Sequence, residues 1–265
     1  MRQSSPAAIH RAGERRLIGA ASLAVFLLAW EMVSRAGLVD PMFISSPVRV
    51  VNAGFLLLWS GEMRADLQVS AAEFLFGYLG AAVAGILLGL VMGWSKRAQY
   101  IFGPFVDTLN AVPRVTLLPL LVIWFGIGIW SKVVVVFLGA VIPILINTQA
   151  GVNANEARFL KVARSFGASE LKIFVSIILP GAVPFIFTGL KYGAGRALLG
   201  VVVGELYAAT AGVGHMIADA GNSFQTDVVF FGIALFTASG LVTVAVLDRF
   251  ERRFENWRPK VGASA

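Results

Sequence analysis

The sequence FLFGYLGAAVAGILLGLVMGW, residues 74–94, runs for the width of a membrane without a charged residue. About 20 apolar residues in a helix cross a hydrocarbon layer of about 30 Å, because each residue adds about 1.5 Å. Small residues at four-residue spacing let two helices approach closely in lipid. This stretch has them at Gly77, Ala81, Gly85, Gly89 and Gly93. We predict a buried membrane helix, although glycine is also common in membrane helices in general.

The whole chain has the composition of a membrane protein. Of its 265 residues, 57% are apolar and 14% are charged, whereas soluble domains contain about 25% charged residues. Six segments are long and apolar enough to span a membrane. They are residues 17–33, 74–94, 104–127, 132–148, 184–206 and 228–247. The fold class we predict is therefore an all-α polytopic membrane protein with six transmembrane helices.

The basic residues predict which side of the membrane each connection faces. Lys and Arg are concentrated in residues 1–16, 96–97, 153–174 and 249–265, and the other connections hold few of them. An excess of Lys and Arg marks the cytoplasmic loops of membrane proteins. Both termini and the connection between the fourth and fifth spans are therefore predicted to be cytoplasmic. This distribution explains the net charge of +7 without a nucleic acid partner, and we expect none.

The domain organisation follows from these spans. We predict a cytoplasmic tail over residues 1–16, a six-helix transmembrane domain over 17–248 and a second cytoplasmic tail over 249–265. The basic residues before the first span would also suit a signal peptide. Residues 30–32 read Trp-Glu-Met, however, where a cleavage site would have small residues. We therefore interpret the first span as a retained helix.

The residue inventory excludes several kinds of chemistry. The chain has no cysteine and two histidines, so it has no disulfide, no cysteine nucleophile and no multi-histidine metal site. It also lacks the motif Gly-x-x-x-x-Gly-Lys-Ser/Thr that holds nucleotide phosphates. We predict no catalytic residue, no metal site and no cofactor on this chain.

Three prolines interrupt the third predicted span. Pro104, Pro113 and Pro119 each remove a backbone donor and displace a carbonyl one turn earlier. The sequence therefore predicts a kinked or broken helix here.

Polar residues within the spans mark candidates for a transport path. Asp107, Asn110 and Arg114 have helical spacing that places them on one face. They either line a polar path in the bundle, because polar groups in lipid are costly, or lie at headgroup level. Glu205, near the outer end of the fifth span, is the other candidate. This span also carries glycines for close packing, so we expect it near the centre of the assembly.

The connection between the fourth and fifth spans reads NANEARFLKVARSFGASELKIFVSIILP, residues 153–180, called the 153–180 loop below. Asn153 can cap a first helix, Gly167 can end it in a left-handed conformation, and Ser169 can cap a second. The sequence predicts two short helices at an angle, with the small edge at 163–167 facing outward. That edge can enter a groove on another protein, or the basic helix can lie on the membrane surface.

The 153–180 loop resembles a known motif. Its spacing resembles that of the "EAA" loop of permease subunits of ATP-binding-cassette (ABC) importers. The matching pattern is Gly167, then nine residues, Ile177, one residue and Leu179-Pro180. Lys161-Val162 replaces the first two residues of the family's Glu-Ala-Ala. The resemblance implies an ATPase-coupling role for Ala163, Gly167, Ala168, Ile177, Leu179 and Pro180.

Four other segments extend the resemblance over about residues 47–257. LLPLLVIWFGIG at 117–128, PILINTQAGV at 143–152, FTGLKYGAGRA at 187–197 and TDVVFFGI at 226–233 are similar to the nitrate, sulfonate and taurine branch of these permeases. The resemblance implies the type I importer permease (MetI-like) fold in a bacterial cytoplasmic membrane. It also implies a small anionic solute, while aromatic acids and vitamin precursors stay open.

The partners implied by the resemblance complete this interpretation. They are an ABC ATPase dimer that binds ATP and Mg²⁺, a second copy of the permease, a periplasmic or lipid-anchored solute-binding protein, and membrane lipid. An ion-coupled secondary transporter or channel is the alternative, but it would need ionisable residues deep in several spans. An intramembrane enzyme is a further alternative, but the chain lacks the His-Glu-x-x-His motif.

Overall fold

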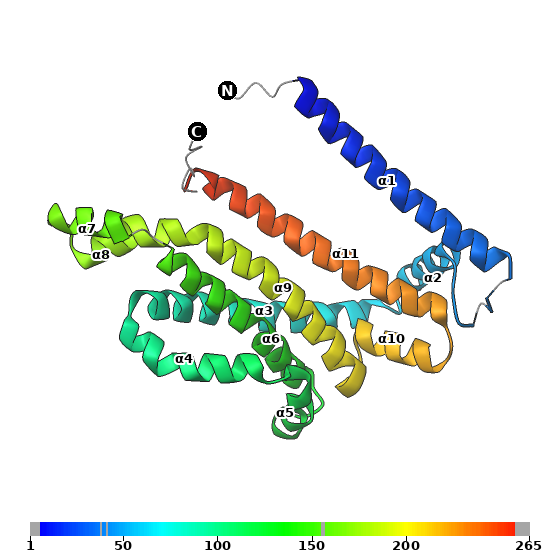
Figure 1. Ribbon diagram of the computed structural model, residues 1–265. Helices are drawn as coiled ribbons and strands as arrows, with labels where there is room; N and C mark the ends of the chain where they lie inside the picture. The colour runs from blue at the N-terminus through cyan, green and yellow to red at the C-terminus, as the bar shows by residue number, and fades with distance from the viewer. Residues whose placement is uncertain (1–5, 38, 41, 155–156, 258–265) are drawn as a thin grey trace. The chain divides into compact units, whose positions relative to one another are not determined.

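The structure is a computed structural model that describes residues 6–257 except 38, 41, 155 and 156. Every regular element in this part of the chain is helical, in agreement with the predicted fold class (Figure 1). In chain order the elements are α1 (Pro6–Arg35), α2 (Pro47–Ser60), α3 (Arg64–Trp94), α4 (Lys96–Ala111), η1 (Arg114–Leu117), α5 (Leu118–Phe125), α6 (Ile129–Asn153), α7 (Ala157–Ser165), α8 (Glu170–Ile173), η2 (Phe174–Ile178), α9 (Leu179–Ala208), α10 (Val213–Asn222), α11 (Thr226–Glu251) and η3 (Arg252–Trp257).

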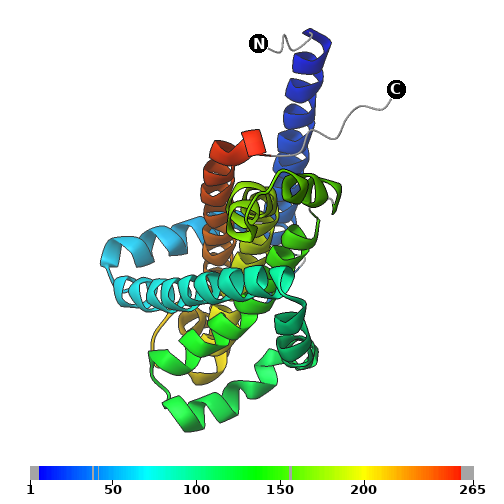
Figure 2. The ribbon, with the colours of Figure 1, turned by 90° about the vertical axis from the view of Figure 1, so that its left-hand side faces the viewer.

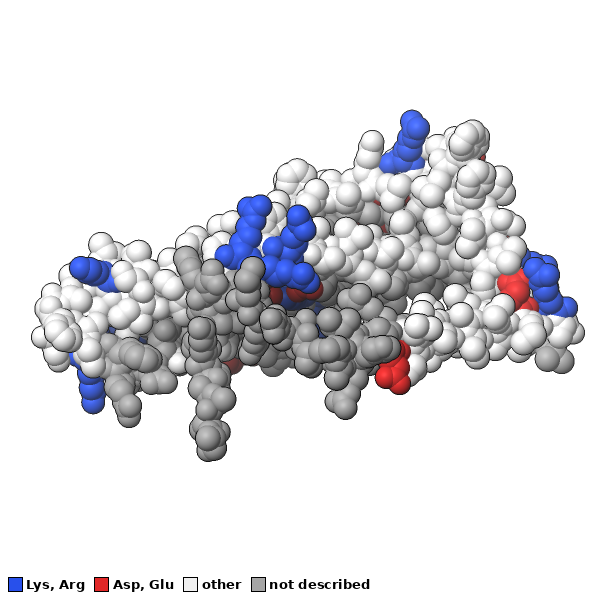
Figure 3. Space-filling view, turned by 90° about the horizontal axis from the view of Figure 1, so that it is seen from above, with Lys and Arg blue, Asp and Glu red and all other residues white. Residues whose placement is uncertain are grey.

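The described residues contain five or six candidate membrane spans. Five continuous stretches are long and apolar enough: Leu17–Arg35, Arg64–Trp94, Ile129–Asn153, Glu170–Ala208 and Thr226–Phe254. The helices Lys96–Ala111 and Arg114–Phe125 make a sixth if they are counted as one span bent by 92°. The count then equals the predicted six. Uncharged residues, drawn in white, cover most of the described surface in the view of Figure 3.

The predicted break in the third span occurs at a single proline. Pro104 lies inside α4 and Pro119 lies in the first turn of α5, so neither ends a helix. The chain breaks at Val112 and Pro113, where Val112 is extended with φ −72° and ψ 126°. A residue before proline is driven out of the helical region by the proline ring. Pro113 therefore separates the two arms of the bent pair.

The chain divides into two compact units. The first comprises residues 1–63 and 216–233, and the second comprises residues 64–215 and 234–265. Within the first unit, Nε1 of Trp30 on α1 donates a hydrogen bond to the carbonyl of Ser45 at 2.8 Å. The same indole ring lies 5.1 Å from the ring of Phe230. These contacts hold α1 to the segment before α2 and to the start of α11.

The small residues of α3 pack against α6 in the second unit. A methyl group added at Gly77 would lie 2.6 Å from Cβ of Val136, and one at Gly85 would lie 2.9 Å from Cγ2 of Ile144. Residue numbers increase together along the contact, so α3 and α6 run parallel. The predicted close packing along this stripe is confirmed.

Helix α9 packs antiparallel on another face of α6. A methyl group at Gly200 would lie 3.1 Å from Cα of Val136, and one at Gly189 would lie 3.1 Å from Cα of Ile144. Figures 1 and 2 show α3, α6 and α9 side by side. In the most apolar stretch of α6, 61% of residues are buried, compared with 28% for α3 and for the α9 span. The central helix of this unit is therefore α6, and α9 packs directly against it. The expected position of the fifth span near the centre of the assembly stays a prediction.

Candidate functional site

The 153–180 loop folds into two short helices joined by a tight turn. Gly167 has φ +75°, its N–H donates to the Arg164 carbonyl at 2.9 Å, and the N–H of Ala168 donates to the Ala163 carbonyl at 3.1 Å. These two bonds define a Schellman turn, which needs a left-handed residue that glycine supplies without strain. Oγ of Ser169 then accepts from the N–H of Lys172 at 3.4 Å. The predicted left-handed conformation of Gly167 and the predicted capping role of Ser169 are confirmed.

The predicted start of the first helix is wrong. Asn153 is the last residue of α6 and does not cap α7, which begins at Ala157. Helix α6 continues through Asn153, because Gly151 and Val152 are packed and buried as part of this helix. Residues 155 and 156 lie outside the described part of the chain.

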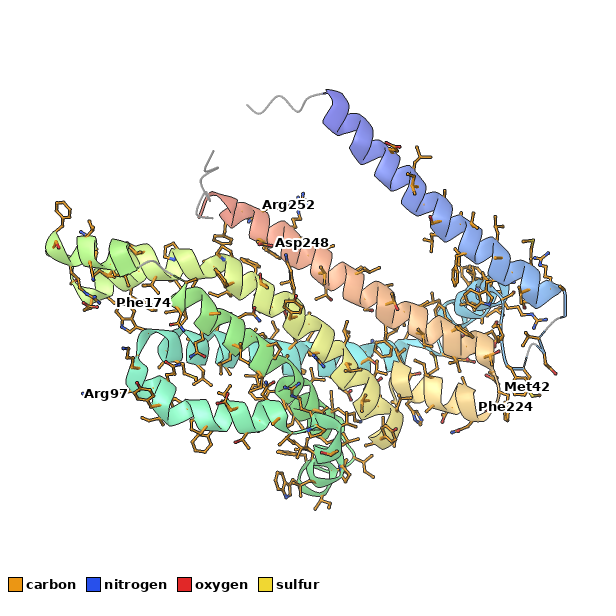
Figure 4. All side chains as sticks on the ribbon, in the orientation of Figure 1. Met42, Arg97, Phe174, Phe224, Asp248 and Arg252 are labelled. Carbon is orange, nitrogen blue, oxygen red and sulfur yellow. The ribbon has the colours of Figure 1, made fainter. Side chains whose placement is uncertain are left out.

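The inner face of the loop is anchored to the transmembrane helices. Ala163, Ala168 and Ile177 pack against a cluster of four buried residues. The members of this cluster, called the loop anchor below, are Val152, Ile173, Ile178 and Ala182. The ring of Phe174 also meets Trp94, at the end of α3, edge-on at 5.5 Å (Figure 4). Leu179 and Pro180 begin α9 and are half-buried.

The outer face of the loop is an exposed apolar edge. Phe166 is 88% exposed and Leu171 is 74% exposed, on opposite sides of the Gly167 turn. Gly167 is itself exposed, with open space around its Cα. The sequence predicted that the edge at 163–167 faces outward, but Ala163 packs inward against the loop anchor.

An ion pair fixes the angle between the two helices. Nε and Nη2 of Arg164 donate to the two carboxylate oxygens of Glu170 at 2.8 Å and 3.2 Å. These hydrogen bonds raise the pKa of the Arg164 guanidinium above its ordinary value. Both side chains are more than half exposed, so the pair adds little stability. Its bidentate geometry instead restricts the orientation of α7 relative to α8.

The four candidates for a polar path fall in three places. Nη2 of Arg114 donates to Oδ1 of Asn110 at 3.3 Å, and both residues line a cavity of about 310 Å³ between the α4–η1 break and helices α6 and α9. Asp107 is exposed on α4 and does not line this cavity. Glu205 is 1% exposed and accepts hydrogen bonds from Oγ of Ser70 and the N–H of Gly214, each at 2.6 Å.

Glu205 belongs to a buried charged cluster that the sequence did not predict. Nζ of Lys132 lies 3.5 Å from Oε1 of Glu73, and these residues are 3% and 0% exposed. Nζ also donates to the carbonyl of Ile127 at 3.1 Å. Oγ of Ser70, which donates to Glu205, accepts from the N–H of Val213 at 2.9 Å. The cluster thus joins α3, α6, α9 and the segment that begins α10.

The register of α3 on α6 explains why Glu73 and Lys132 meet. Gly77, Gly85, Gly89 and Gly93 face Val136, Ile144, Thr148 and Val152, so facing residues differ by a constant 59 in number. Glu73 lies one step earlier on the same stripe, and Lys132 is 59 residues beyond it. The predicted spans began at 74 and 132, which placed both residues at the lipid boundary. The four-residue repeat, continued one step back, was the available signal.

The chain matches a family of transport proteins. Residues 69–256 match the model of the binding-protein-dependent transport system inner membrane component. A permease protein assigned to aliphatic sulfonate transport, SsuC of Bacillus subtilis (strain 168), is 35% identical over 89% of this chain and 85% of its own length. The taurine transport system permease protein TauC of Escherichia coli (strain K12) is 34% identical over 91% of this chain and 89% of its own length.

A solved structure has the same fold. A chain of the MetNI methionine ABC transporter, in an inward-facing conformation, aligns with a TM-score of 0.65 over 75% of this chain and 97% of its own length. Its sequence identity is 17%, so this likeness shows the fold alone. The chain therefore belongs to the binding-protein-dependent inner membrane components, as a multi-pass permease subunit of an ABC importer in the sulfonate and taurine branch rather than an enzyme.

Proposed function

We propose that this permease imports a small sulfonate-type anion and that the 153–180 loop couples it to a separate ATPase. The observation that carries the coupling role is the exposed apolar edge of Phe166 and Leu171 on a turn whose inner face is fixed to the loop anchor. Large exposed apolar groups of this kind mark protein interaction sites. The sequence has no phosphate-binding loop, which supports our proposal that ATP and Mg²⁺ bind to the partner.

The loop anchor supplies the mechanical connection. Ile173 and Ile178 lie in the α8–η2 segment, Val152 lies in the last turn of α6, and Ala182 lies in the first turn of α9. A force on α7 and α8 is therefore transmitted to the two helices that form the core of the second unit. An ATPase dimer that binds the loop more tightly in one conformation of the permease shifts the permease toward that conformation. The size of the shift is set by the difference in binding free energy between the two conformations. To change the ratio of the two permease conformations from 1:99 to 99:1, this difference in binding free energy must be about 5.5 kcal/mol.

The topology we propose puts both termini and the 153–180 loop in the cytoplasm. The charge distribution in the sequence supports it. The contact of Trp94 with Phe174 supports it further, because it brings the basic turn after α3 to the same end as the loop. On this topology a solute-binding protein, periplasmic or lipid-anchored, delivers solute from the other side. Two permease copies and two ATPase subunits then complete the importer.

The proposed solute class rests on the relatives. SsuC and TauC are named for aliphatic sulfonates and taurine, compounds that share a sulfonate group. We therefore propose uptake of a small organic sulfonate, driven by ATP hydrolysis. The test is reconstitution of the permease, ATPase and solute-binding protein in liposomes, with labelled ethanesulfonate or taurine outside and ATP inside.

The coupling role predicts a specific defect for Phe166→Ser. Burial of a phenylalanine at an interface contributes about 1.5–3 kcal/mol, so loss of the ring should weaken ATPase binding by about 10- to 100-fold. Phe166 is 88% exposed and so buries little surface in the folded chain, and insertion and thermal stability should be unchanged. ATPase affinity is measured on permease in nanodiscs, and ATP-driven uptake is measured in liposomes. Phe43→Ser, at a 65% exposed phenylalanine before α2, is the control and should bind normally. Wild-type ATPase affinity in Phe166→Ser would exclude the coupling role of this edge.

A further inference from the structure

The cavity at the α4–η1 break is lined by positively charged side chains. Its lining includes Arg114 from η1 and Arg196 from α9, and it includes no acidic residue. Two other cavities of the second unit, of about 260 and 820 Å³, are lined by uncharged residues. Of these three cavities, this one therefore has the lining best suited to an anion.

The two guanidinium groups lack acidic partners within the described chain. Arg114 donates to the neutral amide of Asn110, and its Nε is buried without a hydrogen-bond partner. No ion pair joins either arginine to a carboxylate in the described part of the chain. Charges within membrane spans are costly and normally pair with an opposite charge. Two positive groups around one cavity also repel each other, and an anion between them would remove both costs.

The backbone keeps this cavity open and in position. The 92° bend at Pro113 turns the chain so that Asn110, at the end of α4, and Arg114, after the break, line the same space. On the opposite wall, a methyl group at Gly139 would lie 3.1 Å from the carbonyl oxygen of Arg196. Helix α9 therefore packs directly on α6 at the level of Arg196. The backbone of Arg196 is therefore fixed by the packing of α9 on α6, and the backbone of Arg114 follows the turn at Pro113.

We propose that Arg114 and Arg196 bind the sulfonate group of the transported solute inside the membrane-spanning bundle, with Asn110 as an additional polar contact. This inference rests on the proposed import of a small sulfonate and assigns its recognition to this chain. A guanidinium group forms two parallel hydrogen bonds to an oxyanion, and a sulfonate offers three oxygens to two such groups. The volume of about 310 Å³ is at the small end of ligand cavities, which favours short alkanesulfonates such as ethanesulfonate.

Direct binding tests the proposal without the solute-binding protein. The complete permease–ATPase complex is placed in nanodiscs of phosphatidylcholine and titrated with ethanesulfonate, and affinity is read by calorimetry and by ligand-induced thermal stabilisation. Arg114→Gln and Arg196→Gln should each weaken binding tenfold or more, and Arg114→Lys should retain part of it. Arg97→Gln, at an exposed arginine after α3, should bind like the wild type. Without ligand, neither glutamine variant should melt earlier, because the arginines have no acidic partner to lose.

The outcomes separate this site from the proposed function. Wild-type affinity in both glutamine variants would overturn the site while ATP-driven uptake by the wild type still supported the importer. Earlier melting of both variants without a change in affinity would assign the arginines a structural role and also overturn the proposal. A repeat with phosphatidylglycerol in the nanodisc tests a lipid phosphate as the occupant. If this lipid stabilises the wild type through both arginines and ethanesulfonate does not, the solute site is wrong.

Discussion

Lys132→Met should destabilise the second unit by about 3–5 kcal/mol, the cost of removing one partner of a buried ion pair. Lys132 is the described cation nearest to Glu73, with Nζ 3.5 Å from Oε1. Glu73 is fully buried, and the carboxylate of Glu205 belongs to the same cluster. Methionine keeps the length and the apolar stem of lysine, so the change removes mainly the charge. Thermal unfolding of the purified permease in detergent measures the effect, with Lys96→Met, at an exposed lysine, as the matched control.

A second substitution distinguishes lost charge balance from lost packing. Glu73→Gln in the Lys132→Met background removes the carboxylate that lysine balanced, so the double variant should recover much of the lost stability. If packing were the cause, the double variant would remain as unstable as Lys132→Met. Unchanged melting of Lys132→Met alone would show that the buried pair has no structural role.

Gly89→Leu should separate α3 from α6 and prevent accumulation of folded permease. A methyl group at this position would lie 2.6 Å from Cβ of Thr148 and 2.7 Å from the carbonyl oxygen of Leu145. The carbonyl belongs to the central helix and cannot move without shifting α6, which also supports α9. Overpacking of a core usually costs about 1–3 kcal/mol, and we expect more here because the obstacle is backbone. The measurement is the yield of monodisperse permease and its melting temperature.

Gly80→Leu is the control for this prediction because it lies on the same helix but off the stripe. A methyl group at Gly80 would meet the ring of Phe137 at 3.6 Å, an ordinary contact, and the position is exposed. This variant should insert and melt like the wild type. Equal yields and melting temperatures for both leucine variants would contradict the packing of α3 on α6.

Local signals predicted the parts of this fold that depend on neighbouring residues. The four-residue repeat of small residues predicted the face that α3 buries, and the Gly167 and Ser169 signals predicted the turn in the 153–180 loop. In each case the relevant backbone geometry extends over one or two helical turns. Three prolines predicted a kinked or broken third span, and the break lies at Pro113. Pro119 does not break the chain, because a proline in the first turn of a helix is tolerated.

The rest depended on contacts between distant residues. All spans are apolar, so composition could not show that α6 is the central helix. Glu73 and Lys132 lay at predicted span boundaries, where charges are ordinary, and only the register of α3 on α6 brings them together. Arg196 and Arg114 line the same cavity, although their positions in the sequence differ by 82. Such pairings are set by tertiary packing, which a single sequence does not specify.

Cross-linking at position 166 tests the coupling role of the 153–180 loop most directly. The chain contains no cysteine, so Phe166→Cys introduces a unique thiol on the exposed edge. Trp59→Cys, at an 82% exposed residue of α2, is the control. In the assembled importer, a short thiol-to-amine reagent should join position 166 to the ATPase, with a yield that changes when ATP binds, and should not join position 59. Absence of this cross-link in a complex that hydrolyses ATP and takes up solute would contradict the coupling role.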